Sequence, residues 1–221
     1  MAGVTTPLWR ALENWNGTVF LLAGGAFAVA IAINGLDLFT PIATQEGLLL
    51  SIEGIAGFGA VVFSFLGLLG LYPRVKTTTP RLGRAGIIFA ILPGVFFFGL
   101  LAVCSILAPF LGLPSLKTIV PSFDIIMKTM ILCFAVALTL FGVGSLRTAV
   151  PSRIAGGLLL VLAAAWFAFF GALQVYHYDV PIWVTFVQTT MMAAPLVSLG
   201  YHLRTGTEPY DRTRLSPTTG D

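Results

Sequence analysis

The chain has 221 residues, of which 57% are hydrophobic and only 10% are charged. Soluble domains carry roughly 25% charged residues, so this composition excludes an ordinary soluble domain of the same size. The net charge of +3 comes from basic residues in short segments beside apolar runs. This pattern indicates membrane topology and argues against a nucleic-acid-binding surface.

The first segment, residues 1–16, is predicted to be a short amphipathic helix that lies in the membrane interface. Thr6 and Pro7 suit the start of a helix, and apolar residues then recur at helical spacing as far as Trp15. The first spanning helix is expected over residues 18–33. A cleaved signal peptide is the alternative for this region. A retained helix is favoured because the leading segment is long and its arginine is offset by a glutamate.

Five more apolar stretches have the length of a spanning helix. They cover residues 48–72, 85–107, 122–147, 154–176 and 182–203. Pro93 and Pro195 lie inside two of these stretches and are expected to kink the helices. The proline-rich connection at residues 108–121 is expected to be interfacial or partly re-entrant on the outer side. Residues 17–204 then form the membrane domain, and the polar residues 205–221 form a disordered cytoplasmic tail.

Basic residues gather at alternate helix ends, and this asymmetry orients the chain. Ten of them are assigned to one side: Arg10, Arg74, Lys76, Arg81, Arg84, Arg147, Arg153, Arg204, Arg212 and Arg214. Lys117 and Lys128 are assigned to the other side. Because cytoplasmic loops carry the excess of Lys and Arg, the sequence predicts an all-α bundle of six transmembrane helices. Both termini are expected in the cytoplasm, and the protein is expected to be a multi-pass protein of the cell membrane.

The most distinctive motif is the basic segment between the second and third spans. It reads Gly-Leu-Tyr-Pro-Arg at residues 70–74 and Thr-Pro-Arg-Leu-Gly-Arg-Ala-Gly at residues 79–86. This motif resembles small multi-pass membrane proteins of halophilic archaea that carry no assigned function. The resemblance implies six helices in the cell membrane, and it transfers no site residues.

A weak internal repeat relates the second and third predicted spans to the fourth and fifth. Gly67 corresponds to Gly142, and Gly86 corresponds to Gly156. A parallel duplication is one explanation. The frequent use of Gly, Pro and Arg in short loops is the other.

Glu53 is the foremost candidate for a functional side chain because it is the only acid inside a continuous apolar run. It lies about 31 Å along a helix from Arg74, and Lys128 lies about 28 Å from Arg147. Both are therefore expected near the outer edge of the hydrocarbon layer. Asp124 and Lys128 are four residues apart and can pair with each other. Glu53 is then either a rim residue at the head groups or an inward-facing residue that pairs with Lys128 or lines an outward vestibule.

His177 and Asp179 extend this predicted polar rim. A histidine with an acid two residues later can suggest a metal site or a proton relay, but a metal site needs more ligands than this segment supplies. An aromatic interface belt of Tyr176, Tyr178 and Trp183 explains the same segment without special chemistry. We therefore expect no metal, no cofactor and no catalytic residue here.

The most polar stretch inside the bilayer is Gln188-Thr189-Thr190. Threonine hydroxyls commonly bond to the backbone of their own helix, and Gln188 can bond to a neighbouring helix. Hydrogen bonding between helices is the favoured interpretation. A flexible, ligand-contacting section next to Pro195 is the alternative.

Smooth faces of small residues, such as Ala164, Ala168 and Ala172, accompany a membrane interior without charge. Such faces allow helices to pack closely in lipid. The favoured function is a non-catalytic structural or accessory component that packs against itself or other membrane subunits. The alternative is a carrier or channel for a small, weakly polar solute, with an outward vestibule near Glu53. An intramembrane enzyme is least favoured because no nucleophile–base pair or metal-ligand spacing occurs.

Overall fold

The computed structural model describes residues 7–39, 48–102, 123–176 and 180–205. All regular elements in these residues are helices: α1 (Pro7–Phe39), α2 (Leu48–Thr78), α3 (Pro80–Ala102), α6 (Phe123–Thr148), α7 (Arg153–Tyr176) and α8 (Ile182–Thr205). Five of them, α1, α2, α6, α7 and α8, contain a stretch that is long and apolar enough to cross a membrane. The fold is therefore all-helical, and the protein is a multi-pass membrane protein.

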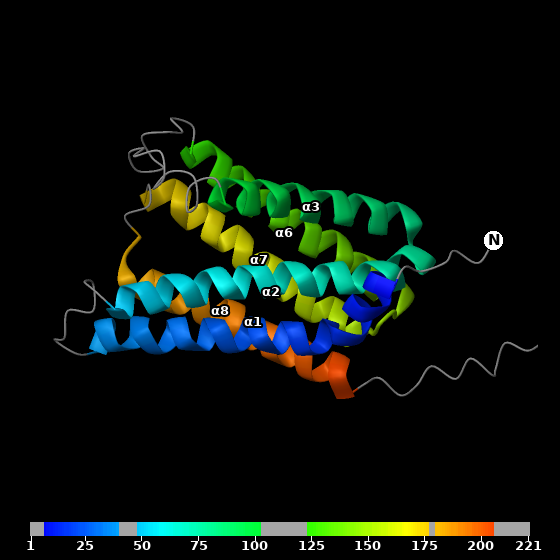
Figure 1. The fold of residues 1–221 in the computed structure, drawn as a ribbon, viewed down its shortest axis with the longest axis horizontal. Coiled ribbons are helices and arrows are strands. Elements are labelled where there is room, and N and C mark those ends of the chain that lie inside the picture. Colours follow the sequence, from blue (N-terminus) through cyan, green and yellow to red (C-terminus); the bar gives the residue numbers. More distant parts are fainter. Residues whose placement is uncertain (1–6, 40–47, 103–122, 177–179, 206–221) are drawn as a thin grey trace, which may run out of the picture.

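The six helices form two layers of three (Figure 1). In one layer α1 packs between α2 and α8, and in the other α6 packs between α3 and α7. Contacts of α2 with α3 and α6, together with contacts of α7 with α8, join the two layers. The last three predicted spans agree with α6, α7 and α8 to within two residues. The predicted connection at residues 108–121 and the predicted tail from residue 206 lie outside the described residues.

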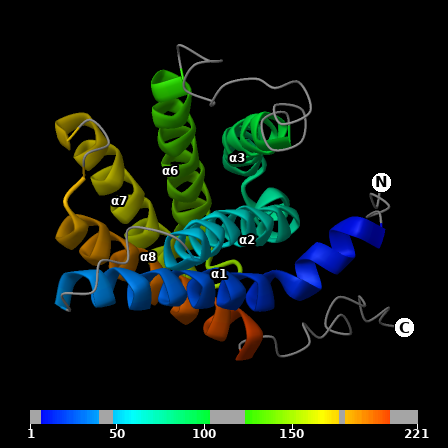
Figure 2. The same cartoon turned by 60° about the vertical axis from the view of Figure 1, so that its left-hand side comes forward.

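The first helix differs from the prediction, because α1 is continuous through the expected boundary at residues 16–17 and past residue 33. The polar and apolar residues that it buries recur every three or four positions: Asn16, Phe20, Ala23, Phe27, Ala30 and Asn34. A single buried stripe of this kind keeps one helix packed along its whole length, so the span ends at Phe39 instead. The first turns of α1 are inclined to the rest of the helix (Figure 2).

The basic loop predicted between the spans, at residues 73–84, is almost entirely helical. α2 continues through Pro73 to Thr78, and Thr79 alone separates it from α3. Threonine hydroxyls satisfy the last carbonyl groups of α2: the Thr79 hydroxyl donates to the Val75 oxygen at 3.1 Å, and the Thr79 amide donates to the same oxygen at 2.8 Å. Side-chain capping of this type extends a helix that hydropathy alone would end earlier.

Two pairs of glycines bring helix backbones into direct contact. At the α6–α7 crossing, a methyl group on Gly156 would lie 2.9 Å from the carbonyl oxygen of Gly142. At the α1–α8 crossing, a methyl group on Gly200 would lie 2.7 Å from the carbonyl oxygen of Gly17. Both distances are shorter than normal carbon–oxygen contacts, so these helices approach as closely as they do only because a side chain is missing.

The helix pairs of the weak repeat do not pack in the same way. Gly156 of the second pair contacts Gly142 within that pair, whereas Gly67 faces the Phe20 ring of α1. Gly86 faces the Phe141 ring of α6 rather than α2. The corresponding glycines therefore contact different partners.

Candidate functional site

The helix ends that carry most of the predicted cytoplasmic cations lie together, at what we call the basic end of the bundle. An ion pair joins the Arg74 Nε atom of α2 to the Glu13 Oε1 atom of α1 at 3.0 Å. Beside α7, the Ser152 hydroxyl accepts the Ala155 amide and forms a 2.7 Å hydrogen bond with the His202 Nε2 atom of α8. The clustering of positive charge at one end therefore agrees with the pattern of the sequence.

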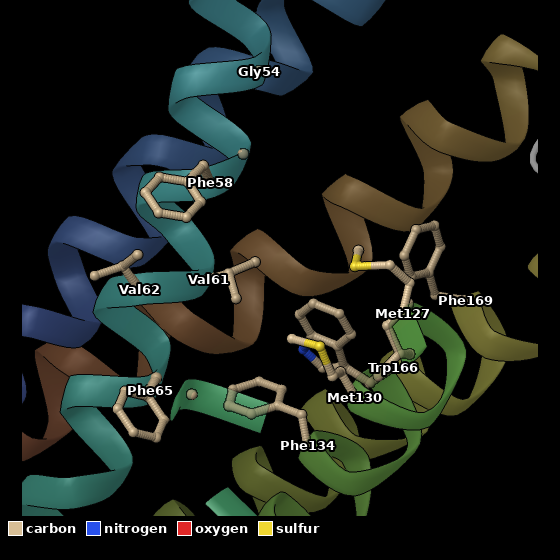
Figure 3. A pocket seen from close by; sticks show the side chains of 13 residues that line it. Gly54, Phe58, Val61, Val62, Phe65, Met127, Met130, Phe134, Trp166 and Phe169 are labelled. Atoms are coloured by element: carbon tan, nitrogen blue, oxygen red, sulfur yellow. The ribbon is translucent and has the colours of Figure 1, made fainter. Parts of the chain in front are cut away.

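A cavity of about 310 Å³ lies among α2, α3, α6 and α7, and we call it the apolar cavity. Its lining residues are almost all hydrophobic or glycine: Gly54, Gly57, Phe58, Val61, Val62, Phe65, Gly94, Met127, Met130, Ile131, Phe134, Trp166 and Phe169. Figure 3 shows the α2 side chains on one side of it and Met127, Met130 and Trp166 on the other. Clefts of about 300–1,000 Å³ with apolar walls are typical of binding sites for small molecules.

Two of the lining glycines create this space. A methyl group on Gly54 or on Gly57 would meet nothing within 4 Å. By contrast, a methyl group on Gly94 would lie 2.6 Å from the Phe65 ring. The missing side chain at Gly94 therefore allows α3 to pack against Phe65 of α2. The glycines of α2 therefore have two roles: Gly67 and Gly70 lie against α1, whereas Gly54 and Gly57 leave room toward the second layer.

Trp166 is the only described lining residue whose side chain contains a nitrogen or oxygen atom. Its ring lies edge-on to Phe134, with centroids 5.1 Å apart, and to Phe169 at 6.0 Å. The residue is 5% exposed, and its indole N–H has no hydrogen-bond partner among the described residues. Buried tryptophan N–H groups usually have a partner. This nitrogen has almost no accessible surface, so a molecule in the cavity would meet the apolar part of the ring instead.

The predicted rim residues are only partly brought together. Glu53 is half-buried, and the groups that act on it are Asn34 and Asp37 of α1. The Asn34 amide is buried beside Glu53 but completes no hydrogen bond of normal geometry with any residue that the structure describes. Lys128 is half-buried on α6. The rest of the predicted rim lies outside the described part of the chain: the Asp124 side chain, and both His177 and Asp179.

The polar stretch of α8 packs as the inter-helix interpretation expects. Gln188 is buried, and its Nε2 atom donates to the carbonyl oxygen of Ala165 in α7. The Thr189 hydroxyl donates to the Thr185 oxygen at 2.8 Å, and the Thr190 hydroxyl donates to the Phe186 oxygen at 2.8 Å. These polar groups therefore bind helix backbone rather than an open cavity.

Sequence reasoning missed Asn34 and the apolar cavity. Asn34 lies just beyond residue 33, where the first spanning helix was predicted to end, although its position continues the three-and-four spacing of Phe27 and Ala30. The cavity was missed because glycine that packs and glycine that leaves space look identical in a sequence. Among the described residues, no group of three His, Cys, Asp or Glu side chains could hold a metal ion.

Comparisons of the chain with protein-family models, with curated proteins and with solved structures find no match. The resemblance of residues 70–86 to membrane proteins of halophilic archaea therefore stays a prediction.

Proposed function

We propose that this protein is a non-catalytic structural or accessory component of the cell membrane that associates with a second copy of itself through the outer face of α7. It crosses the membrane six times, with α3 as a span, and its basic end and both termini lie in the cytoplasm. The exposed small-residue face of α7 is the observation that carries this proposal.

That face is a continuous stripe along α7. Its residues recur every three or four positions: Gly157, Val161, Ala164, Ala168, Gly171 and Val175. Val161 and Val175 are 52% and 71% exposed, and methyl groups on Gly157 or Gly171 would meet nothing within 4 Å. Small residues at this spacing let two helices approach closely in lipid, where packing rather than hydrophobic burial drives association.

A second copy suits this face better than an unrelated partner. Copies inserted in the same orientation can pair by two-fold symmetry, so each residue of the stripe then meets the same stripe of the other copy. Gln174 is exposed one turn beyond Gly171. In a symmetric pair its amide would lie near its counterpart, and amide hydrogen bonds between helices favour association in membranes.

The carrier alternative has less support. It needs a polar path from Glu53 past Gln188, but Gln188 donates to the Ala165 carbonyl group and the cavity beyond Gly54 is apolar. The Glu53 side chain interacts with α1. No observation on the described residues favours transport over packing.

The double variant Ala164→Phe/Ala168→Phe is expected to stay folded and to lose self-association, because two rings would separate the α7 stripes without entering the bundle. Single-molecule photobleaching of labelled protein in lipid vesicles measures the copies in each spot, and we expect a shift from two steps to one. Ala28→Phe/Ala32→Phe is the matched control, because both alanines are exposed at the same spacing on α1. A wild-type protein that is monomeric at all densities would overturn the proposal, as would a dimer lost only in the control.

A further inference from the structure

The apolar cavity is partly open at the surface of the bundle and has room for an apolar molecule. Interiors contain few voids larger than a water molecule, and an engineered apolar cavity of about 150 Å³ already binds benzene. This one has about twice that volume, 310 Å³. Water is a poor occupant because a buried water needs two to four polar partners, and the described lining residues present almost no polar surface to the cavity.

The cavity lies in the half of the bundle away from the basic end. Counted along α2, Phe65 is about 14 Å from Arg74 and Gly54 is about 30 Å from it. The cavity therefore extends from near mid-membrane to the outer edge of a hydrocarbon layer that is about 30 Å thick. Its lining residues on α2, from Gly54 to Phe65, extend about 16 Å along the helix, and this placement in the outer half of the membrane rests on the orientation proposed above.

Polar residues adjoin the outer end of the cavity. Glu53 precedes the lining residue Gly54 in α2, and Lys128 follows the lining residue Met127 in α6. Both are half-buried. A molecule with a hydrocarbon chain and a polar head would thus have apolar walls around the chain. Its head would lie at the depth of these two residues, of which Glu53 interacts with α1.

We infer that the apolar cavity binds one hydrocarbon chain of an outer-leaflet membrane lipid, whose polar head lies at the level of Glu53 and Lys128. The occupant is a lipid rather than a soluble ligand because the cavity lies within the hydrocarbon layer and its wall is almost wholly apolar. Met127 and Met130 favour such an occupant, because their flexible side chains adapt to an irregular chain.

The first test uses photocrosslinking of the full-length protein in phospholipid vesicles that contain a phospholipid with a diazirine at the end of one acyl chain. Digestion and mass spectrometry locate the modified residues. We expect modification of cavity residues, with Met130 and Phe134 enriched at least fivefold over exposed residues of α6 such as Leu132. Labelling of Leu132 and other exposed residues at the same level as Met130 would overturn the inference.

The second test fills the cavity. Gly54→Leu/Gly57→Leu places two side chains in open space, so the variant is expected to fold. After purification in mild detergent, it is expected to retain at least tenfold less lipid per protein than the wild type. Gly25→Leu is the control, because Gly25 also has open space but is exposed on α1, away from the cavity and from the α7 stripe. Equal lipid retention by all three proteins, or no retained lipid on the wild type, would overturn the inference. If the filled variant does not fold, the crosslinking result decides alone.

Discussion

Gly156→Leu is expected to lower the free energy of unfolding by about 3 kcal/mol, because overpacking a tight contact costs about 1–3 kcal/mol and more where backbone must move. Even the first added carbon would lie 2.8 Å from the Leu146 amide nitrogen and 2.9 Å from the Gly142 carbonyl oxygen. Neither backbone atom can rotate away, so α6 and α7 must separate. Unfolding by increasing SDS in detergent micelles, followed by tryptophan fluorescence, measures the change.

Gly157→Leu provides the matched control for this experiment. It is the next residue of the same helix and receives the same side chain, but a methyl group there would meet nothing within 4 Å. Helix propensity and hydrophobicity change equally in the two variants, so the difference between them isolates the α6–α7 crossing. Equal stability of the two variants would mean that the helices do not cross at Gly156.

The second large effect is expected from Gly200→Leu, which would separate α1 from α8. The first added carbon would lie 2.6 Å from the Leu21 amide nitrogen and 2.7 Å from the Gly17 carbonyl oxygen. A loss of about 3 kcal/mol is again expected. Because this crossing shares no residue with the α6–α7 crossing, the effects of Gly156→Leu and Gly200→Leu should add. The same SDS titration measures both single variants and the double variant.

Gly25→Leu is the control for the α1–α8 crossing, since a methyl group on Gly25 meets nothing within 4 Å. It is expected to change stability by less than about 1 kcal/mol, as exposed substitutions usually do. A Gly200→Leu protein as stable as Gly25→Leu would show that α1 and α8 do not meet at this glycine.

The sequence predicted the helices well because apolar stretches of spanning length are a strong signal. The bounds of α6, α7 and α8 were close to the prediction, whereas α1 and α2 are longer than expected. Both errors have one cause, which is that hydropathy ends a helix at the first polar residues. In α1 the polar residue Asn34 belongs to the buried stripe, and at the end of α2 the Thr79 hydroxyl donates to the Val75 carbonyl oxygen.

The candidate site was less predictable because it depends on how helices pair. The expectation for Gln188 agrees with its hydrogen bond to α7, since a hydrogen bond to a neighbouring helix stabilises a buried amide in lipid. The surroundings of Glu53 were not predictable, because its neighbour Asn34 lies beyond the predicted end of the first span. The apolar cavity has no sequence signature. Gly54 leaves open space whereas Gly67 packs against Phe20, and this difference depends on how α1 and α6 are arranged around α2.

The central claim is that the bundle crosses the membrane with its basic end in the cytoplasm. It is tested most directly by labelling single cysteines with a membrane-impermeant maleimide, in a background where Cys104 and Cys133 are replaced by serine. Arg153→Cys at the basic end is expected to react in inside-out vesicles and to stay unlabelled in intact cells. Trp183→Cys, exposed near the start of α8 at the opposite end, is expected to react in intact cells. Labelling of Arg153→Cys from outside intact cells would contradict the proposed orientation and place the apolar cavity in the inner leaflet instead.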